Sequence, residues 1–461
     1  MKKQRFIAFF IGICVLLAGC RNGEFGAEYA MREAEYNLAL PAGEVNLSYE
    51  VPQAVPNVIV DRLGYEPESG KIVVFKGKQM PSSFTVRDAG TGKIVYTGTV
   101  KAKGNEKDET EYYYYGDFSD VKQSGNYYIQ IDTYGESYPF LIHDNLYYSL
   151  YKRSFDRLHA MRSDGGNTEE GWRMEEKGEN REIGACISLY QLLLCYEMFP
   201  SACTDDMGTS ESGNGTADLL DECRYEIEWL IRQAQINPGG SGEACAYRAA
   251  ALAKYAYLTK NMDSAFYGEC LRASEAAWKG ISTENPAPAD LRSLAAVELY
   301  RLTGGRQYLA FSEEYLETCV QRTGKLSELE FWSGVTYLNT KNKVEVELCD
   351  ALIKKIMDEA EEIAKQSKED SFFVCSGRGT ENADALLREM MRIGIVNHII
   401  TNHEYNTVIE NYFHYLLGRN QNSSCYVSWW EEQELPGKDL MEDPAQNTAF
   451  LFVLSGLLGN A

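Results

Sequence analysis

The chain has 461 residues, of which 44% are apolar and 25% charged, so it can bury a core and is not expected to be disordered. It carries 45 Lys and Arg against 68 Asp and Glu, a formal net charge of −23. This acid excess argues against a nucleic-acid partner, which needs a basic surface, and against electrostatic docking on anionic lipid. It does not distinguish an enzyme from a binding protein.

The first twenty residues resemble a bacterial lipoprotein signal. Three basic residues precede an apolar run over 6–17 that is too short to span a membrane and is typical of a signal peptide. Leu17-Ala18-Gly19-Cys20 resembles the lipobox, in which the cysteine is acylated. We therefore predict a signal over 1–20, a lipid anchor at Cys20 and an extracytoplasmic place in the bacterial cell envelope. An ordinary signal peptide with a chance cysteine is the alternative. Residues 21–56 lack clear periodicity and are predicted to be a tether.

From residue 57 to 143 the pattern is typical of short strands. The segment Asp88-Ala89-Gly90-Thr91-Gly92 is a hairpin turn signal. Seven β-branched or aromatic runs predict a β-sandwich. They cover 58–60, 71–75, 83–86, 94–96, 112–115, 127–131 and 138–142.

From residue 144 onward the period becomes helical. Twelve helices without strands suit a bundle, an α-solenoid or a closed double ring. The amphipathic segments lie near 145–161, 183–198, 216–235, 243–259, 263–279, 288–302, 306–321, 327–340, 345–367, 381–401, 404–417 and 445–458.

Motifs in both regions resemble glycoside hydrolase family 9, the cellulase and endoglucanase family. Residues 60–65 (Val-Asp-Arg-Leu-Gly-Tyr) look like the opening strand of the immunoglobulin-like domain that precedes such enzymes. The runs 196–200, 211–215, 218–230, 295–304 and 415–420 are similar to the helical domain. The resemblance implies a mainly α chain, with an (α/α)6 toroid over 144–461 preceded by a small all-β immunoglobulin-like sandwich over 57–143. The family is known for inverting cleavage of β-1,4-glucans, so a polysaccharide or oligosaccharide is the implied partner.

The same resemblance reveals a difference at the catalytic base. Inversion needs a carboxylate base and a carboxylic acid roughly 6.5–9.5 Å apart. The family base is an aspartate pair in a Gly-Trp-x-Asp-Ala-Gly-Asp motif. Here the motif begins at Gly171-Trp172, and the aspartate positions fall on Met174 and Lys177. Glu175 or Glu176 is a candidate substitute base, and the alternative is a solvated acidic loop.

The acid position is also altered. The family acid is a glutamate just before the last helix, and its ungapped position falls on Met441. Glu442, one residue further on, is the candidate acid. Its alternative role is a negative charge favoured by the helix dipole.

Aromatic side chains could still hold a sugar by stacking against its apolar face. Trp172, Tyr426, Trp429 and Trp430 fall where the family cleft lies and are the candidate substrate-binding residues, with burial in the core as the alternative. The His/Arg sugar-binding segment of the family has no counterpart in 428–436, which contains neither residue type.

No metal site or cofactor is predicted. The five histidines lie near no cysteine cluster, which argues against zinc. Calcium is implied only by the family resemblance, because no loop has the spacing of oxygen ligands that calcium requires.

Three functions remain open. The first is a degenerate family 9 domain on a cell-surface lipoprotein that binds β-glucan-type polysaccharide with lost or much reduced hydrolysis. The second is an active glycosidase with Glu442 as acid and Glu175 or Glu176 as base. The third is a non-catalytic module for assembly in the envelope.

Overall fold

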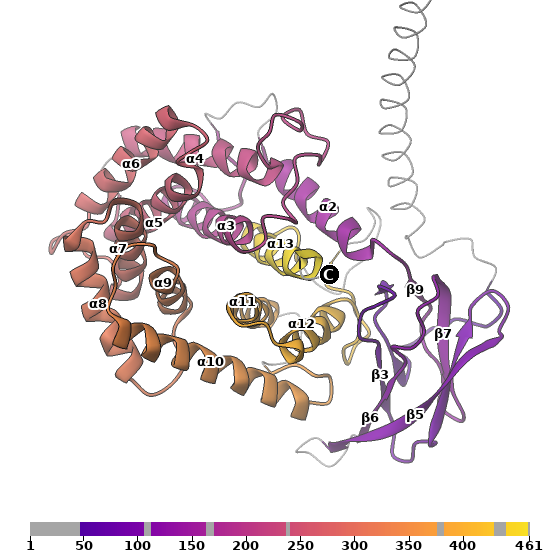
Figure 1. The fold of residues 1–461 in the computed structure, drawn as a ribbon. Coiled ribbons are helices and arrows are strands. Elements are labelled where there is room, and N and C mark those ends of the chain that lie inside the picture. The colour runs from indigo at the N-terminus through magenta and orange to yellow at the C-terminus, as the bar shows by residue number, and fades with distance from the viewer. Residues whose placement is uncertain are drawn as a thin grey trace, which may run out of the picture.

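The structure is a computed structural model that describes residues 47–105, 112–162, 170–236, 240–375, 382–427 and 439–459. Figure 1 shows two parts, a β-sandwich followed by a ring of helices. The predicted lipid anchor at Cys20 and the predicted stacking residues Trp429 and Trp430 lie outside the described residues.

The sandwich contains all seven predicted strands and two short additional ones. Their order is β1-β3-β6-β5-β4-β7-β9-β2, with β8 paired to β7. Neighbours are antiparallel except β2 and β9, which are parallel. The long strand β5 pairs with β4 through its first half and with β6 through its second half, so it joins both sides of the sandwich. The strands are β1 (Val58–Ile59), β2 (Gly64–Tyr65), β3 (Ile72–Lys76), β4 (Ser83–Asp88), β5 (Ile94–Asn105), β6 (Tyr112–Asp117), β7 (Gly125–Ile131), β8 (Gly135–Glu136) and β9 (Phe140–Ile142).

The predicted hairpin turn joins β4 to β5. The Asp88 side chain accepts a hydrogen bond from Thr91 N at 2.7 Å, and Gly92 N donates to Asp88 O at 2.8 Å. Gly92 has a φ of 71°, a conformation that glycine adopts without steric cost. The local sequence therefore determines this turn.

All twelve predicted helices are present in the described residues and alternate between an inner and an outer layer, which gives the (α/α)6 toroid (Figure 1). The inner helices are α3 (Glu179–Met198), α5 (Gly242–Thr259), α7 (Ala289–Thr303), α9 (Glu328–Leu338), α11 (Ala383–Ile399) and α13 (Pro444–Gly459). The outer helices are α2 (Leu146–His159), α4 (Asp218–Ile236), α6 (Ser264–Lys279), α8 (Arg306–Gln321), α10 (Val346–Glu369) and α12 (His403–Leu416).

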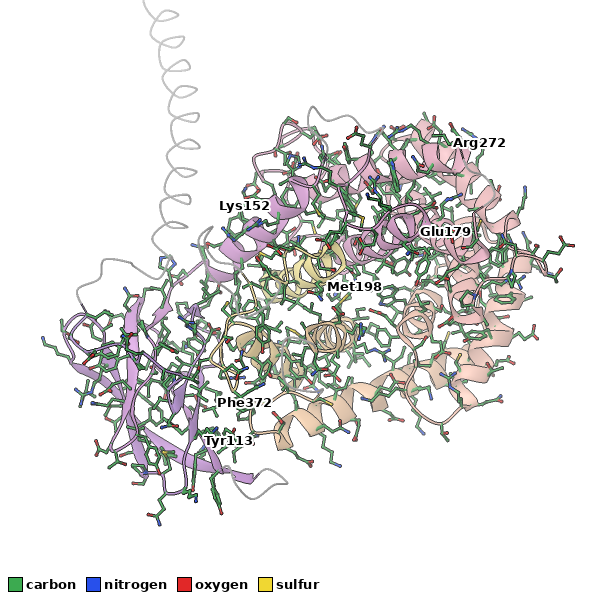
Figure 2. All side chains as sticks on the ribbon, turned by 180° about the vertical axis from the view of Figure 1, so that it is seen from behind. Tyr113, Lys152, Glu179, Met198, Arg272 and Phe372 are labelled. Atoms are coloured by element: carbon green, nitrogen blue, oxygen red, sulfur yellow. The ribbon has the colours of Figure 1, made fainter. Side chains whose placement is uncertain are left out.

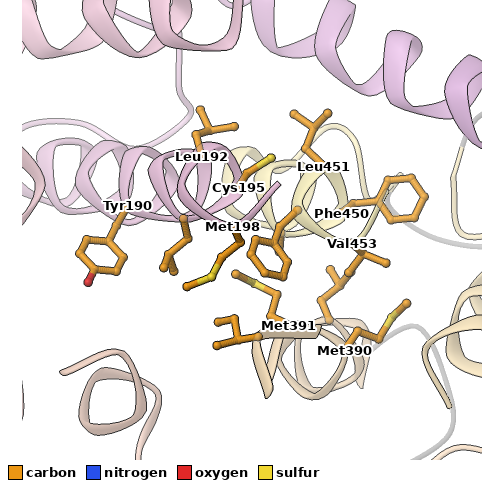
Figure 3. Close-up of a cluster of buried hydrophobic side chains, with 14 of the residues drawn as sticks. Tyr190, Leu192, Cys195, Met198, Met390, Met391, Phe450, Leu451 and Val453 are labelled. Atoms are coloured by element: carbon orange, nitrogen blue, oxygen red, sulfur yellow. The ribbon is translucent and has the colours of Figure 1, made fainter. Parts of the chain in front are cut away.

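The two layers differ in how apolar residues are distributed around each helix. In inner helix α13, residues 447–455 are all buried. Outer helix α10 buries one stripe, including Leu352, Ile356 and Ile363, and exposes charged residues elsewhere. A helix surrounded by neighbours is apolar on every side, whereas a surface helix is amphipathic. Figure 3 shows this inner packing, with Met198 of α3, Met391 of α11 and Val453 of α13 directed towards one another.

The N-terminal ends of the inner helices gather at one end of the ring, which we call the mouth. Ser241, the N-cap of α5, donates its backbone N–H to Glu179 of α3 at 3.1 Å. Gln446 of α13 donates to Asp384 of α11 at 2.6 Å. Ser327, the N-cap of α9, donates to Asp290 of α7 at 3.1 Å. The loops before these helices therefore line the mouth.

Two of the motifs that resemble the family meet between sandwich and ring. Asp61 accepts from Leu63 N at 2.7 Å and Gly64 N at 2.9 Å, and its other oxygen lies 2.8 Å from His414 Nδ1 of α12. Arg62 N donates to Leu417 O at 3.0 Å. Because Asp61 and His414 are fully buried, their contact holds the two domains together.

A second contact joins the same two domains at aromatic side chains. Tyr113 of β6 packs on Phe372 with ring centroids 5.2 Å apart, and both are labelled in Figure 2. The end of the predicted tether also contacts the sandwich. Ser48 N donates to Ala89 O at 2.8 Å, and Tyr49 stacks on Tyr128 with ring centroids 3.8 Å apart. The last residues of the predicted tether thus pack on the sandwich, where aromatic stacking offsets the loss of chain freedom.

Candidate functional site

The loop at 171–178, which is predicted to correspond to the base motif of the family, is anchored by buried hydrogen bonds. Trp172 Nε1 donates to Glu222 Oε1 at 2.7 Å, and Trp172 N donates to Glu226 Oε2 at 2.6 Å. Both glutamates lie on α4 and are fully buried. Arg162 Nε and His159 Nδ1 lie 3.0 and 2.8 Å from the other oxygen of Glu222. We call these five residues the base-loop clamp.

The glycine before Trp172 is required by this arrangement. Gly171 has a φ of 62°, and a Cβ at this position would lie 2.7 Å from the Trp229 ring. Arg181 of α3 also holds the loop. Its guanidinium lies 4.5 Å from the Trp229 ring centroid and donates a hydrogen bond to Trp172 O at 2.7 Å. The loop thus keeps its anchor on both sides.

The anchored loop does not present the carboxylates that the family chemistry needs. Met174 is half-buried and packs against the core, and Lys177 is exposed. Neither side chain can act as a carboxylate base. The candidate substitutes Glu175 and Glu176 are also exposed, as their alternative role in a solvated loop requires.

The acid position lies next to the start of α13. Met441 is buried and Glu442 is exposed. Asp443 accepts hydrogen bonds from Ala445 N and Gln446 N at 3.0 and 3.1 Å, so it caps the helix. Glu442 therefore remains the candidate acid at the mouth.

Two predicted stacking residues lack an open ring face. Trp172 is 0% exposed and Tyr426 is 2% exposed. Since a sugar stacks only on a ring that it can reach, these two positions do not fit the predicted substrate-binding role. Trp172 is a structural residue of the base-loop clamp instead, and Tyr426 packs edge-on to Tyr415 with ring centroids 6.3 Å apart.

The mouth contains a pocket that the sequence did not reveal. It has a volume of about 260 Å³. Four inner helices contribute to it, through Ile187 of α3, Tyr247 of α5, Asp290 of α7, and Glu328 and Trp332 of α9. We call it the mouth pocket. It combines aromatic and apolar walls with two carboxyl groups, which is the usual composition of a small-ligand site.

Burial shapes the electrostatics of the mouth pocket. Burial raises the pKa of Glu328, although Arg388 and Arg392 oppose this effect. Burial also raises the pKa of Tyr247, and the nearby carboxylates add to the shift. Asp290 accepts from the Ser327 hydroxyl. Acidic residues in a first helical turn are common, so no sequence signal distinguished these two carboxyls from ordinary helix-end charges.

Deeper in the ring, buried ion pairs connect three inner helices. Glu298 of α7 accepts from Tyr190 at 2.7 Å and from Arg301 at 2.8 Å. Arg301 and Lys254 both bind Glu197 at the end of α3. Although burial opposes ionisation, these two cations lower the pKa of Glu197 to about 2. The family-like runs 196–200 and 295–304 therefore hold the ring together.

The described residues show neither a metal-binding cluster nor a helix suited to a membrane. No group of three or more His, Cys, Asp or Glu side chains in that part of the chain is placed to hold a metal ion. Among the described helices, none has the length and apolar character that crossing a membrane requires.

Family comparisons match both parts of the chain. The family described as "Cellulase N-terminal ig-like domain" matches residues 53–136, and "Glycosyl hydrolase family 9" matches residues 232–434. Neither matched range includes the base loop at 171–178 or residues 441–442.

Individual relatives agree with these matches. Endoglucanase D of Acetivibrio thermocellus is 21% identical over 80% of this chain and 72% of its own length. A xyloglucan-specific endo-β-1,4-glucanase of Bacteroides ovatus is 25% identical over 40% of this chain and 38% of its own length.

Solved structures share the fold. A metagenome-derived family 9 endoglucanase has a TM-score of 0.72 at 18% identity and covers 88% of this chain and 99% of its own. A Bacteroides ovatus family 9 protein has a TM-score of 0.69 at 16% identity, with coverages of 88% and 100%. The chain is thus a glycosyl hydrolase family 9 homologue that carries the cellulase-type immunoglobulin-like domain.

Proposed function

We propose that this chain is a lipid-anchored protein of the bacterial cell envelope that binds β-glucan-type polysaccharide at the mouth of the toroid, with lost or much reduced hydrolysis. One observation carries the proposal: the base-loop clamp is intact, but the loop that it holds presents Met174 and Lys177 where the family has its aspartate pair.

The chemical consequence is a loss of proton transfer. A methionine side chain has no basic oxygen, and a lysine ammonium at neutral pH cannot take a proton from water. General base catalysis contributes ~10²–10⁴-fold to the rate. Hydrolysis should therefore fall by at least this factor, while groups that only contact sugar remain.

The mouth pocket supplies such contacts. Tyr247 is half-buried, so part of its ring can lie against a sugar face. The carboxyl groups of Asp290 and Glu328 can accept hydrogen bonds from sugar hydroxyls. The relatives named above are described as glucanases, one of them as specific for xyloglucan, which supports glucans as the first ligands to test.

The test uses residues 21–461 as purified protein. Titration calorimetry with cello-oligosaccharides, mixed-linkage glucan and xyloglucan should give saturable binding, while release of reducing ends stays at background. Hydrolysis at ordinary family rates by pure protein would refute the loss of catalysis. If Glu442→Gln then abolished that hydrolysis, the result would favour an active glycosidase with relocated carboxylates, in which Glu442 is the acid.

A matched pair of variants tests the place of binding. Tyr247→Ala should weaken glucan binding by about tenfold, since stacking contributes roughly 1 kcal/mol or more. Tyr267→Ala, a change of the same residue type on outer helix α6, should leave binding unchanged. Equal effects of both variants, or none from Tyr247→Ala, would contradict the mouth pocket as the binding site.

A further inference from the structure

A second cavity lies where the sandwich meets the ring, close to the C-terminal parts of α3 and α13. It has a volume of about 170 Å³. Its polar side includes Glu66 of the β2–β3 loop, Tyr147 of α2 and Glu410 of α12. Its apolar side includes Met390 and Val453, which lie beside each other in Figure 3. We call it the junction cavity.

Each of the two carboxylates is held by one of its oxygens. Glu66 Oε1 accepts from Tyr147 N at 2.9 Å, and Glu410 Oε2 accepts from Gly70 N at 3.0 Å. The other oxygen of each carboxylate makes no hydrogen bond within the described residues. Both side chains are thus oriented by the backbone and keep one free acceptor.

The hydroxyl of Tyr147 is the third polar group. Tyr147 is 4% exposed, and its hydroxyl has no hydrogen-bond partner in the described part of the chain. Ser69 lies near it, but the Ser69 hydroxyl donates to Glu66 O at 2.9 Å. A buried hydroxyl without a partner costs roughly 1–3 kcal/mol, so an unbound cavity leaves this group unsatisfied.

The nearby cations are bound elsewhere. Lys71 donates to Pro67 O at 2.7 Å and to Ser69 O at 2.9 Å, both of which are carbonyl groups. Buried Arg419 donates to Asn411 O at 2.7 Å. Neither forms an ion pair with Glu66 or Glu410 among the described residues. Lys71 and Arg419 act on Glu410 only through space, so the cavity still offers three acceptors to a ligand that carries N–H donors.

A primary ammonium group has three N–H donors, which match the free oxygens of Glu66, Glu410 and Tyr147. The remaining lining combines apolar side chains, among them Met390, Ile409 and Val453, with the polar side chains of Glu68, Ser69 and Asn406. A cavity of about 170 Å³ has room for about five water-sized groups, at roughly 30 Å³ each. A ligand that fills this space is short, and its aliphatic part can lie against Met390 and Val453.

We propose that the junction cavity binds a primary alkylammonium ion, whose ammonium group bridges Glu66, Glu410 and Tyr147 while its short aliphatic chain lies against Met390 and Val453. Such a ligand would connect the sandwich to α2 and α12, and it would stabilise the domain junction by mass action.

The test uses residues 21–461 with n-pentylammonium chloride as the probe. Titration calorimetry should give saturable binding with one site, and the melting temperature should rise with probe concentration. Potassium chloride at equal ionic strength tests for a general salt effect, and 1-pentanol tests for apolar binding without charge. Equal stabilisation by either compound, or no saturable heat with the amine, would overturn the proposal.

Variants test the three acceptors. Glu410→Gln should weaken binding of the amine at least about tenfold, because one charged partner is lost. Glu404→Gln, on the exposed side of the same helix, should not. Tyr147→Phe should weaken binding and also raise the melting temperature of the unbound protein, because it removes a hydroxyl without a partner. A Tyr147→Phe protein that binds as tightly as the parent would count against the site, even if Glu410→Gln failed to fold.

Discussion

Replacing Trp172 with phenylalanine should destabilise the protein by about 1.5–3 kcal/mol more than the same replacement at Trp332. Trp172 Nε1 donates at 2.7 Å to Glu222, a buried carboxylate, and phenylalanine has no such donor. Hydrogen bonds to charged groups contribute roughly this amount. The Trp332 side chain makes no hydrogen bond within the described residues, and its ring stacks on Tyr190 with centroids 4.9 Å apart.

The comparison separates the hydrogen bond from the ring. Both changes remove a similar apolar area from the core, because the exposures of Trp172 and Trp332 are 0% and 3%. The difference between the two unfolding free energies therefore reports the bond to Glu222. Urea denaturation followed by circular dichroism gives both values at pH 7.

The same experiment decides between the two roles considered for Trp172. If Trp172 belongs to the base-loop clamp, Trp172→Phe lowers stability and leaves glucan affinity within about twofold. Equal destabilisation by the two variants, within about 0.5 kcal/mol, would refute the importance of the bond. A large loss of glucan affinity at unchanged stability would restore the stacking role.

Three further predictions concern other charged positions. Burial raises the pKa of Glu226 to about 8, above its unfolded value, so the contribution of Glu226 to stability is fully present below about pH 4.5 and is lost as the pH rises through 8. Glu226→Gln should remove this contribution, which changes by at most about 1.4 kcal/mol per pH unit in urea unfolding. Combining Met174→Asp with Lys177→Asp should leave the fold intact and raise release of reducing ends from glucan at least about tenfold, and no increase would show that more than the base is missing. Asp61→Ala should lower the free energy of unfolding by about 3 kcal/mol or more, because Leu63 N, Gly64 N and His414 lose their acceptor. Limited proteolysis should then cut between sandwich and ring more readily, and unchanged cleavage would contradict the interdomain role of Asp61.

The sequence alone determined the order and type of the elements. Runs of β-branched and aromatic residues predicted seven strands, and periods near 3.6 predicted all twelve helices, because strand packing and helix geometry favour these patterns. Two short strands, β2 and β8, were not predicted, and the other differences lie at element ends. Helix α3 begins at Glu179 rather than near 183, since its first turn is polar and lies outside the apolar stripe.

The family resemblance predicted a cleft at one end of the toroid and identified Met174 and Lys177 as substitutions. It did not predict which residues surround them. The run 218–230 carries Glu222 and Glu226, and only the folded chain shows that both hold Trp172. A pattern of periodicity tells which face of a helix is buried, but not which residue it meets.

Tertiary structure alone decided the two cavities. Tyr247, Asp290 and Glu328 of the mouth pocket are separated by about forty residues each along the chain, and they meet because the toroid brings the N-terminal ends of its inner helices together. Glu66 and Glu410 come from different domains, and each alone is an ordinary surface acid in sequence. Their shared burial, their free oxygens and the unpartnered Tyr147 hydroxyl exist only once the sandwich packs against the ring, since desolvation and long-range contacts are properties of the packed chain.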